Sequence, residues 1–487
     1  MMNNNQLLLW SLVLSVVAGV SADASAQPMF SIAEDVAAVR IESSGQNFTP
    51  RQSVTPGGAP RHTSDYDLTV IWAPGEWRAR EEWALHALYP SDVNMNFTMT
   101  YHESLGLTEG QDSLSPSPEK RPMGGARIGA NFKTLWLTNP LILAAHGEVV
   151  AASEFRAAGG RYERVAIVAH DTQWSMVVDL ATGLPVEVST VEADPHRGDI
   201  EHRVVFEDWR EVAGIPFPYR VKQFLEDKLL RREIRTSIIV NPEISPGLFQ
   251  LPENLQDTEE SLREWGWSMS HFSVARAGLG IPQDYFETHS VSFHEVGEDL
   301  YQIRGSEGDH NLLIVGPDGL AIVDAPWFDQ RSEEVLSELA ERWPGKPLKY
   351  LILTHHHIDH SGGFKAYLQA GAALVTGRGN AALFSDALEH AGHEAAAIIA
   401  VGENATLDEI GRRIEVYEIV NTHADATLIA YVPDERLAFV TDLYSPGRSR
   451  NGPRGVSELL TSIRFHGIDV ERFVGGHGEG SGHPDNE

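Results

Sequence analysis

Short apolar runs separated by turn-rich breaks make up most of the chain between residues 67 and 252. Within these runs β-branched and aromatic residues recur at alternate positions, which is the period of a strand with one buried face. Breaks such as residues 181–185 (ATGLP) and 212–216 (VAGIP) separate successive runs, so the pattern predicts an antiparallel meander. The predicted strands are residues 164–169, 174–180, 186–191, 203–209, 219–225 and 229–240.

Two stretches of the first half lack this alternation. Residues 27–65 are polar and show little periodicity, so we expect an irregular lead-in there. Residues 111–125 end in a cluster of prolines and glycines and are predicted to form a loop.

From about residue 289 the pattern changes to strands that alternate with helices. Residues 293–304, 310–315 and 320–323 are predicted strands, and residues 316–319 (GPDG) are a hairpin turn between the last two. Residues 331–343 place Val335, Leu336 and Leu339 on one helical face. Residues 349–353 are typical of a buried strand, and residues 364–369 follow as a helix. The second half is therefore predicted to be an α/β domain.

Between this last strand and helix lie residues 354–363 (THHHIDHSGG), which concentrate metal-binding side chains. Open α/β sheets place ligands at this end of a strand. Residues two apart in an extended segment point to the same side, so His355, His357 and Asp359 can converge, while His360 approaches from the turn. Imidazole and carboxylate are ligands that zinc prefers, and the two glycines allow the backbone to pass close to a metal. The loop therefore predicts a metal site.

These ten residues resemble the H-x-H-x-D-H signature of the metallo-β-lactamase superfamily. The resemblance implies an αββα sandwich with two metal ions. The implied ligands are His355, His357 and His423 for the first metal, Asp359, His360 and His477 for the second, and Asp442 as the bridge. Asp324, which ends the run 320–323, matches a family aspartate that supports the ligand loop from behind, and His356 should point away.

A carboxylate at the bridging position resembles hydroxyacylglutathione hydrolases, lactonases, phosphodiesterases and alkylsulfatases. The resemblance thus implies a hydrolase in which a hydroxide between two metals attacks an ester, thioester, lactone or phosphoester, with Asp359 and Asp442 as catalytic carboxylates. We expect two zinc ions, with iron or manganese as alternatives. Tyr444, Arg448 and His310 are candidate substrate contacts. Three other functions remain open: β-lactam hydrolysis, iron-dependent dioxygenase chemistry on the same scaffold, and a noncatalytic lipid or ligand carrier.

The composition indicates a globular protein with an acidic surface. Of its residues, 42% are hydrophobic and 22% are charged, which is typical of a globular protein. A chain of 487 residues is too long for one ordinary domain, so we expect two. A formal charge of −31 disfavours nucleic acid and anionic membranes as partners. We expect a small-molecule substrate for the hydrolase that the resemblance implies. The chain has no cysteine, which excludes disulfides and thiolate ligands.

Residues 1–26 are typical of a secretory signal, with an apolar core at residues 7–20 and a small-residue cleavage site at residues 24–26 (ASA). We predict export to the periplasm or beyond the cell, with no integral membrane span after cleavage. An uncleaved N-terminal anchor is the alternative.

The first domain, predicted at residues 27–252, resembles the curved half-barrels of lipoprotein-carrier proteins. The resemblance rests on the break at residues 179–185 (DLATGLP) and the close at residues 248–252 (LFQLP). It implies a concave face that binds an apolar ligand or covers the active site of the second domain; the alternative is a structural domain packed on its neighbour. Residues 253–288 are predicted to be a linker with a helix at 259–267, and residues 289–487 the catalytic domain.

Overall fold

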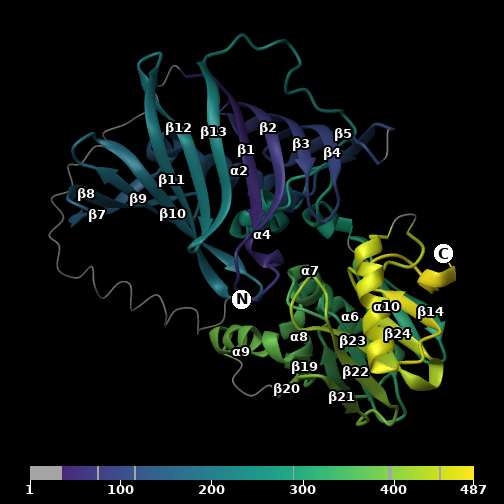
Figure 1. Cartoon of the computed structure of the whole chain (residues 1–487). Helices are drawn as coiled ribbons and strands as arrows, with labels where there is room; N and C mark the ends of the chain where they lie inside the picture. The colour runs from purple at the N-terminus through teal and green to yellow at the C-terminus, as the bar shows by residue number, and fades with distance from the viewer. Residues whose placement is uncertain are drawn as a thin grey trace.

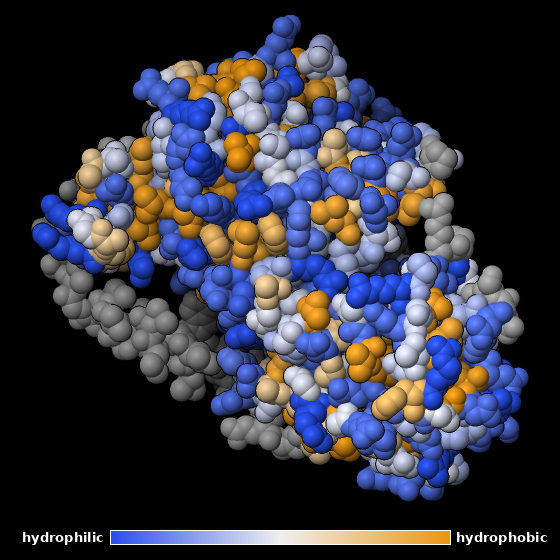
Figure 2. Space-filling view, viewed as in Figure 1, coloured by the Kyte–Doolittle hydropathy of each residue, from blue (hydrophilic) through white to orange (hydrophobic). Residues whose placement is uncertain are grey.

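The computed structural model describes residues 36–73, 76–114, 117–288, 290–392, 397–448 and 451–486, and two β-rich units lie side by side in it (Figure 1). The predicted signal lies outside the described residues. None of the described helices is both long and apolar enough to cross a membrane. Hydrophilic residues cover most of the face seen in Figure 2, and apolar residues form scattered patches on it.

A single 13-stranded sheet forms the first unit, in the order β6-β5-β4-β3-β2-β1-β13-β12-β11-β10-β9-β8-β7. The strands are β1 Val39–Thr49, β2 Arg61–Ala73, β3 Arg78–Ala87, β4 Val93–His102, β5 Leu105–Asp112, β6 Glu119–Pro122, β7 Glu148–Ala157, β8 Gly160–Ala169, β9 Thr172–Asp179, β10 Leu184–Asp194, β11 Gly198–Val212, β12 Ile215–Leu225 and β13 Lys228–Val240. All neighbours are antiparallel, which confirms the predicted meander.

The prediction of an irregular lead-in at residues 27–65 was wrong for its described part, because β1 lies in the middle of this sheet; residues 27–35 lie outside the described residues. It pairs with β2 on one side and with β13 on the other, and so joins the two ends of the meander. Its buried face carries polar residues, among them Ser43 and Asn47, which hide the strand period in the sequence. The predicted loop at residues 111–125 also contains the edge strand β6.

Helices α2 (Gly125–Thr138) and α3 (Pro140–His146) cover one face of the sheet. The segment predicted to be a linker contains α4 (Glu260–Ser268) and α5 (His271–Ala275), and α4 packs directly on α2 (Figure 1). Two glycines allow that contact: a Cβ on Gly129 would lie 2.0 Å from the Arg263 carbonyl, and one on Gly266 1.8 Å from the Ala126 carbonyl. The cavity left between α2 and the sheet is only ≈ 50 Å³, room for about one or two waters rather than an acyl chain.

Two further sheets form the C-terminal unit. The first has the order β14-β15-β16-β17-β18-β19-β20, with parallel pairing from β17 to β20, and the second has the order β21-β22-β23-β24-β25-β26. The strands are β14 Val291–Gly297, β15 Leu300–Gly305, β16 His310–Val315, β17 Leu320–Val323, β18 Leu348–Ile352, β19 Ala373–Gly377, β20 Ile398–Val401, β21 Asn404–Leu407, β22 Ile414–Ile419, β23 Thr427–Val432, β24 Leu437–Val440, β25 Arg472–Gly475 and β26 Ser481–Gly482. The helices are α6 Asp329–Arg342, α7 Ile358–Ser361, α8 Phe364–Gln369, α9 Ala381–His390 and α10 Pro453–His466.

Three apolar layers hold this unit together. Residues such as Leu312 and Phe439 fill the space between the two sheets. On the outer faces, α6, α8 and α9 pack on the first sheet, and α10 packs on the second. The order helix, sheet, sheet, helix confirms the predicted αββα sandwich.

Candidate metal centre

The loop after β18 carries the predicted metal-binding stretch. His355 and His357 lie together, with ring centroids 4.4 Å apart. Asp359 does not extend that row as predicted, because α7 begins at Ile358 and turns the carboxylate toward a different group. His356 points away and lies 2.9 Å from the Ser53 carbonyl through its Nε2.

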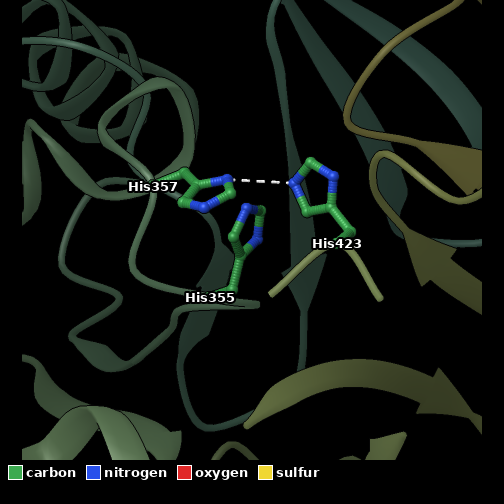
Figure 3. Close-up of side chains that lie close together, drawn as sticks. All are labelled: His355, His357 and His423. Atoms are coloured by element: carbon green, nitrogen blue, oxygen red, sulfur yellow. Dashed lines mark hydrogen bonds between the residues drawn. The ribbon is translucent and has the colours of Figure 1, made fainter. Parts of the chain in front are cut away.

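One histidine from a later loop completes the first group. His423 precedes β23, and its ligand atom lies within 4.8 Å of those of His355 and His357. Its Nε2 is 2.9 Å from Nδ1 of His357, and the three rings lie close together in edge-to-face arrangements (Figure 3). The structure thus brings together the three residues expected to bind the first metal.

The second group lies beside the first. Asp359, His360 and His477 converge there together with Asp309. His477 follows β25, and its Nε2 is 3.1 Å from Nε2 of His360. Gly476 permits this approach, because a Cβ on it would lie 2.7 Å from Thr441 Oγ1 and 3.3 Å from His360 Cε1.

Asp442 lies between the two groups. Its Oδ2 is 3.0 Å from His360 Nε2, 3.4 Å from His423 Nε2 and 3.5 Å from His355 Nε2, and its Oδ1 is 3.1 Å from His477 Nε2. Asp442 follows β24 and has a left-handed backbone with φ 58°, a conformation that is uncommon outside glycine and is often found at functional sites. All seven predicted ligands therefore meet at one place.

Two buried aspartates hold the histidines of the second group. Asp324 accepts hydrogen bonds from the Thr354 backbone N–H at 2.8 Å and from His360 Nδ1 at 3.0 Å, which matches its predicted supporting position. Asp309 accepts from His477 Nδ1 at 3.0 Å and from Trp327 Nε1 at 2.6 Å. Asp309 was not predicted from the sequence. Its only local signal is its own position directly before His310.

The donor atoms fit a metal. Because His360 and His477 donate through Nδ1 to carboxylates, each presents an Nε2 lone pair to the same space. His357 donates through Nε2 to the Ser53 carbonyl, which leaves its Nδ1 lone pair facing His423. His355 Nε2 is buried and makes no hydrogen bond within the described part of the chain. Lone pairs this close repel unless a cation lies among them, and imidazole with carboxylate is a donor set for zinc or iron.

The pKa shifts differ between the two groups of histidines. Burial lowers the pKa of His355 and His357 well below the usual value, so both imidazoles are neutral near pH 7. Burial opposes protonation of His477 as well, but Asp442 and Asp309 outweigh it and raise the pKa of His477 to about 9. Divalent cations would replace such protons.

The three predicted substrate contacts do not gather at the site. Tyr444 is 2% exposed, and its ring packs on Phe473 in the core. Arg448 is exposed on the turn after Gly447, and no contact within the described residues joins its side chain to the ligands. His310 is buried below the loop of His477, with its backbone N–H bonded to the Gly476 carbonyl, and burial lowers its pKa to about 4.

The glycines after the ligands have a different purpose from the predicted one. A Cβ on Gly362 would lie 1.9 Å from the Trp327 carbonyl, and one on Gly363 2.6 Å from the Phe328 carbonyl. The close approach that they allow among the described residues is to the segment after β17.

Residues of the first unit also reach this centre. Gln52 contacts Asp359, the Ser53 carbonyl contacts His357, and the Tyr89 hydroxyl lies 3.4 Å from His423 Nδ1. Sequence reasoning missed all three, since nothing near them in the sequence points to a metal.

Residues 307–482 match the family model described as the metallo-beta-lactamase superfamily. The chain is 26% identical over 169 residues to subunit alpha of 2,4-dinitroanisole O-demethylase from Nocardioides sp. (strain JS1661), which covers 34% of this chain and 51% of that protein. It is 30% identical over 97 residues to (R)-specific secondary-alkylsulfatase from Pseudomonas sp, which covers 20% of this chain and 14% of that protein. The chain thus spans about half or less of the length of these relatives.

Similar solved structures include two metallo-beta-lactamases. That from Pontibacter korlensis is 19% identical with a TM-score of 0.32, over 40% of this chain and 94% of that one. That from Hirschia baltica is 17% identical with a TM-score of 0.31, over 40% of this chain and 93% of that one.

Proposed function

We propose that this chain, whose residues 307–482 form a metallo-β-lactamase superfamily domain, is a hydrolase that binds two zinc ions and cleaves an ester-type bond of a small molecule. The observation that carries the proposal is the position of Asp442. A carboxylate within 3.5 Å of histidines from both groups is suited to bridge two cations. Iron or manganese would fit the same donors.

Two such cations would lower the pKa of bound water toward ~7 and polarise the oxygen of the scissile group. The chain's own residues arrange the site for this. Asp442 offers a carboxylate oxygen that can accept a proton from water, and Asp324 and Asp309 fix the ring orientations of His360 and His477. Asp359 supplies the remaining negative charge of the second group.

Substrate would approach from the side of Asp442, His423 and His477. These side chains are 13%, 13% and 15% exposed, whereas His355 and His360 are fully buried. The relatives whose names state a reaction include alkylsulfatases, which supports adding sulfate esters to the carboxylic ester, thioester, lactone and phosphoester candidates.

The test is the metal content of the purified chain together with hydrolysis of chromogenic carboxylic, sulfuric and phosphoric esters, thioesters, lactones and a β-lactam. Two zinc ions per chain and turnover of an ester are expected. His357→Ala should lose metal and activity, while His390→Ala, which changes an exposed histidine of α9, should lose neither. A folded chain without bound metal would refute the proposal. Cleavage of the β-lactam alone would replace the proposal with β-lactam hydrolysis. One iron ion per chain with oxygen-dependent turnover would replace it with dioxygenase chemistry.

A further inference from the structure

The segment that leaves β1 enters the C-terminal unit next to the metal ligands. It consists of the 3-10 turn Pro50–Gln52 and of Ser53, and both Gln52 and Ser53 are 1% exposed. Arg61 at the start of β2 fixes it, donating from Nε to the Gln52 carbonyl at 2.7 Å and from its guanidinium to the His423 carbonyl at 2.8 Å. The segment is thus held between the central strand of one unit and a ligand loop of the other.

Gln52 is the residue of this segment that touches the second group directly. Its Nε2 donates to Asp359 Oδ1 at 2.6 Å, and its Oε1 accepts from the Tyr89 hydroxyl at 2.9 Å. A carboxylate only accepts, so the amide nitrogen must face Asp359 and the amide oxygen must face Tyr89. The result is a directional chain of hydrogen bonds from Tyr89 through Gln52 to Asp359.

A second donor reaches the other oxygen of the same carboxylate. Arg276, which follows α5, donates from its guanidinium to Asp359 Oδ2 at 3.2 Å, while its guanidinium carbon lies 5.0 Å from the centre of the Trp327 ring. Both oxygens of Asp359 are therefore bonded from residues outside the metallo-β-lactamase-like domain. His360 and His477 are held instead by Asp324 and Asp309 of the metallo-β-lactamase-like domain, so Asp359 alone among these three residues is held from outside it.

We infer that the metal centre is shared between the two units and that Gln52 is a positioning residue for the second metal. Outer hydrogen bonds fix the orientation of ligand side chains, and their loss weakens metal binding by about 10–100-fold. Since Gln52 contacts Asp359 and no residue of the first group, its removal should weaken the second metal and spare the first. This inference rests on the proposed dinuclear function.

The test is a metal titration of the full chain with Gln52→Leu, which removes the donor while keeping a similar volume. Zinc and cobalt(II) binding are measured by chelator competition and by the visible cobalt spectrum, and His477→Ala identifies the signal of the second site. Gln52→Leu should weaken the second site by about 10–100-fold and leave the first unchanged. Gln52→Glu, which places a second carboxylate against Asp359, should weaken it more.

Thr55→Val is the matched control. It removes a hydrogen bond of the same length across the same interface, from Thr55 Oγ1 to Asp425 Oδ2 at 2.6 Å, but touches no ligand. Both of its dissociation constants should equal those of the wild type, and the metal-free forms of all variants should melt at similar temperatures. Unchanged second-site affinity in Gln52→Leu would overturn the inference. Equal weakening of both sites with a lower melting temperature would reduce Gln52 to an interface residue and overturn it too.

The two proposals fail differently. A wild-type chain that binds two cations but hydrolyses none of the esters contradicts the proposed function and leaves the Gln52 comparison valid. A wild-type chain that binds no second cation contradicts both.

Discussion

The carboxylate of Glu192 is the centre of a buried ionic cluster in the first unit. Its side chain is fully buried and lies 3.2 Å from Lys133 Nζ. It also accepts hydrogen bonds from the His271 backbone N–H at 2.9 Å, from the rings of His271 at 2.8 Å and His202 at 3.0 Å, and from the Ser270 hydroxyl. The cluster joins β10, α2 and α5.

Glu192→Leu should therefore be strongly destabilising. The substitution leaves the Lys133 ammonium buried without its partner, together with several donors, and breaking a buried pair in this way costs about 3–5 kcal/mol. In a unit of this size, each kcal/mol lost from the free energy of unfolding lowers the melting temperature by about 2–4 °C, so we expect a decrease of about 6–20 °C.

The loss should also depend on pH. Burial already lowers the pKa of Lys133, and Glu192 opposes that shift, so removing Glu192 lowers the pKa further. The folded variant then binds fewer protons than the unfolded chain, whose lysines titrate near ~10.4, and its stability rises as the pH increases toward that value. The defect should be larger at about pH 7 than at about pH 9.

Urea unfolding followed by tryptophan fluorescence measures both effects, since the Trp174 ring lies 5.9 Å from Lys133 Nζ. Lys133→Met in the Glu192→Leu background removes the unpaired cation and should recover part of the lost stability and most of the pH dependence. A loss below about 1 kcal/mol in Glu192→Leu, or a double variant no more stable than the single one, would refute the reasoning.

Two further predictions concern the support of the metal loop. Asp309→Asn should weaken the second metal by about 10–100-fold, because the amide cannot accept from both His477 Nδ1 and Trp327 Nε1 as the carboxylate does; chelator competition measures it. Gly362→Ala should lower both the melting temperature and the metal content, because its Cβ would lie 1.9 Å from the Trp327 carbonyl. Gly452→Ala should change neither, because no atom of the described residues lies within 4 Å of its new Cβ.

The C-terminal unit was predictable because its strands are apolar runs with clear ends. Strand β18 and the loop after it stand out in the sequence, and the resemblance then located His423, Asp442 and His477 at later strand ends. The direction of Asp359 was not predictable, since it depends on where α7 begins. Asp309 acquires its position through a bridge to His477, and no local pattern records that pairing.

The first unit was less predictable because charged and polar residues lie in its interior. Helix α2 carries Arg127 and Lys133 on buried positions, which breaks the apolar stripe by which a helix is predicted. Asp284 and Glu192 neutralise these two charges, and both lie far from α2 in the sequence. In β1, Asn47 is buried and receives a hydrogen bond from Arg231 of β13 at 2.7 Å, so only the paired sheet explains its polarity.

Under the proposed function, the interface between the units links their docking to metal binding. An apolar cluster of Met269, Phe272, Trp327, Phe328 and Ile358 joins the segment after α4 to the segment after β17 and to Ile358, which lies between His357 and Asp359. Gln52 and the Ser53 carbonyl orient Asp359 and His357 only while the units are docked. A cation that binds the oriented ligands more tightly must stabilise the docked arrangement by the same free energy, because linkage is reciprocal. The large sheet is then part of the metal centre in a thermodynamic sense, even though the seven predicted ligands all belong to the other unit.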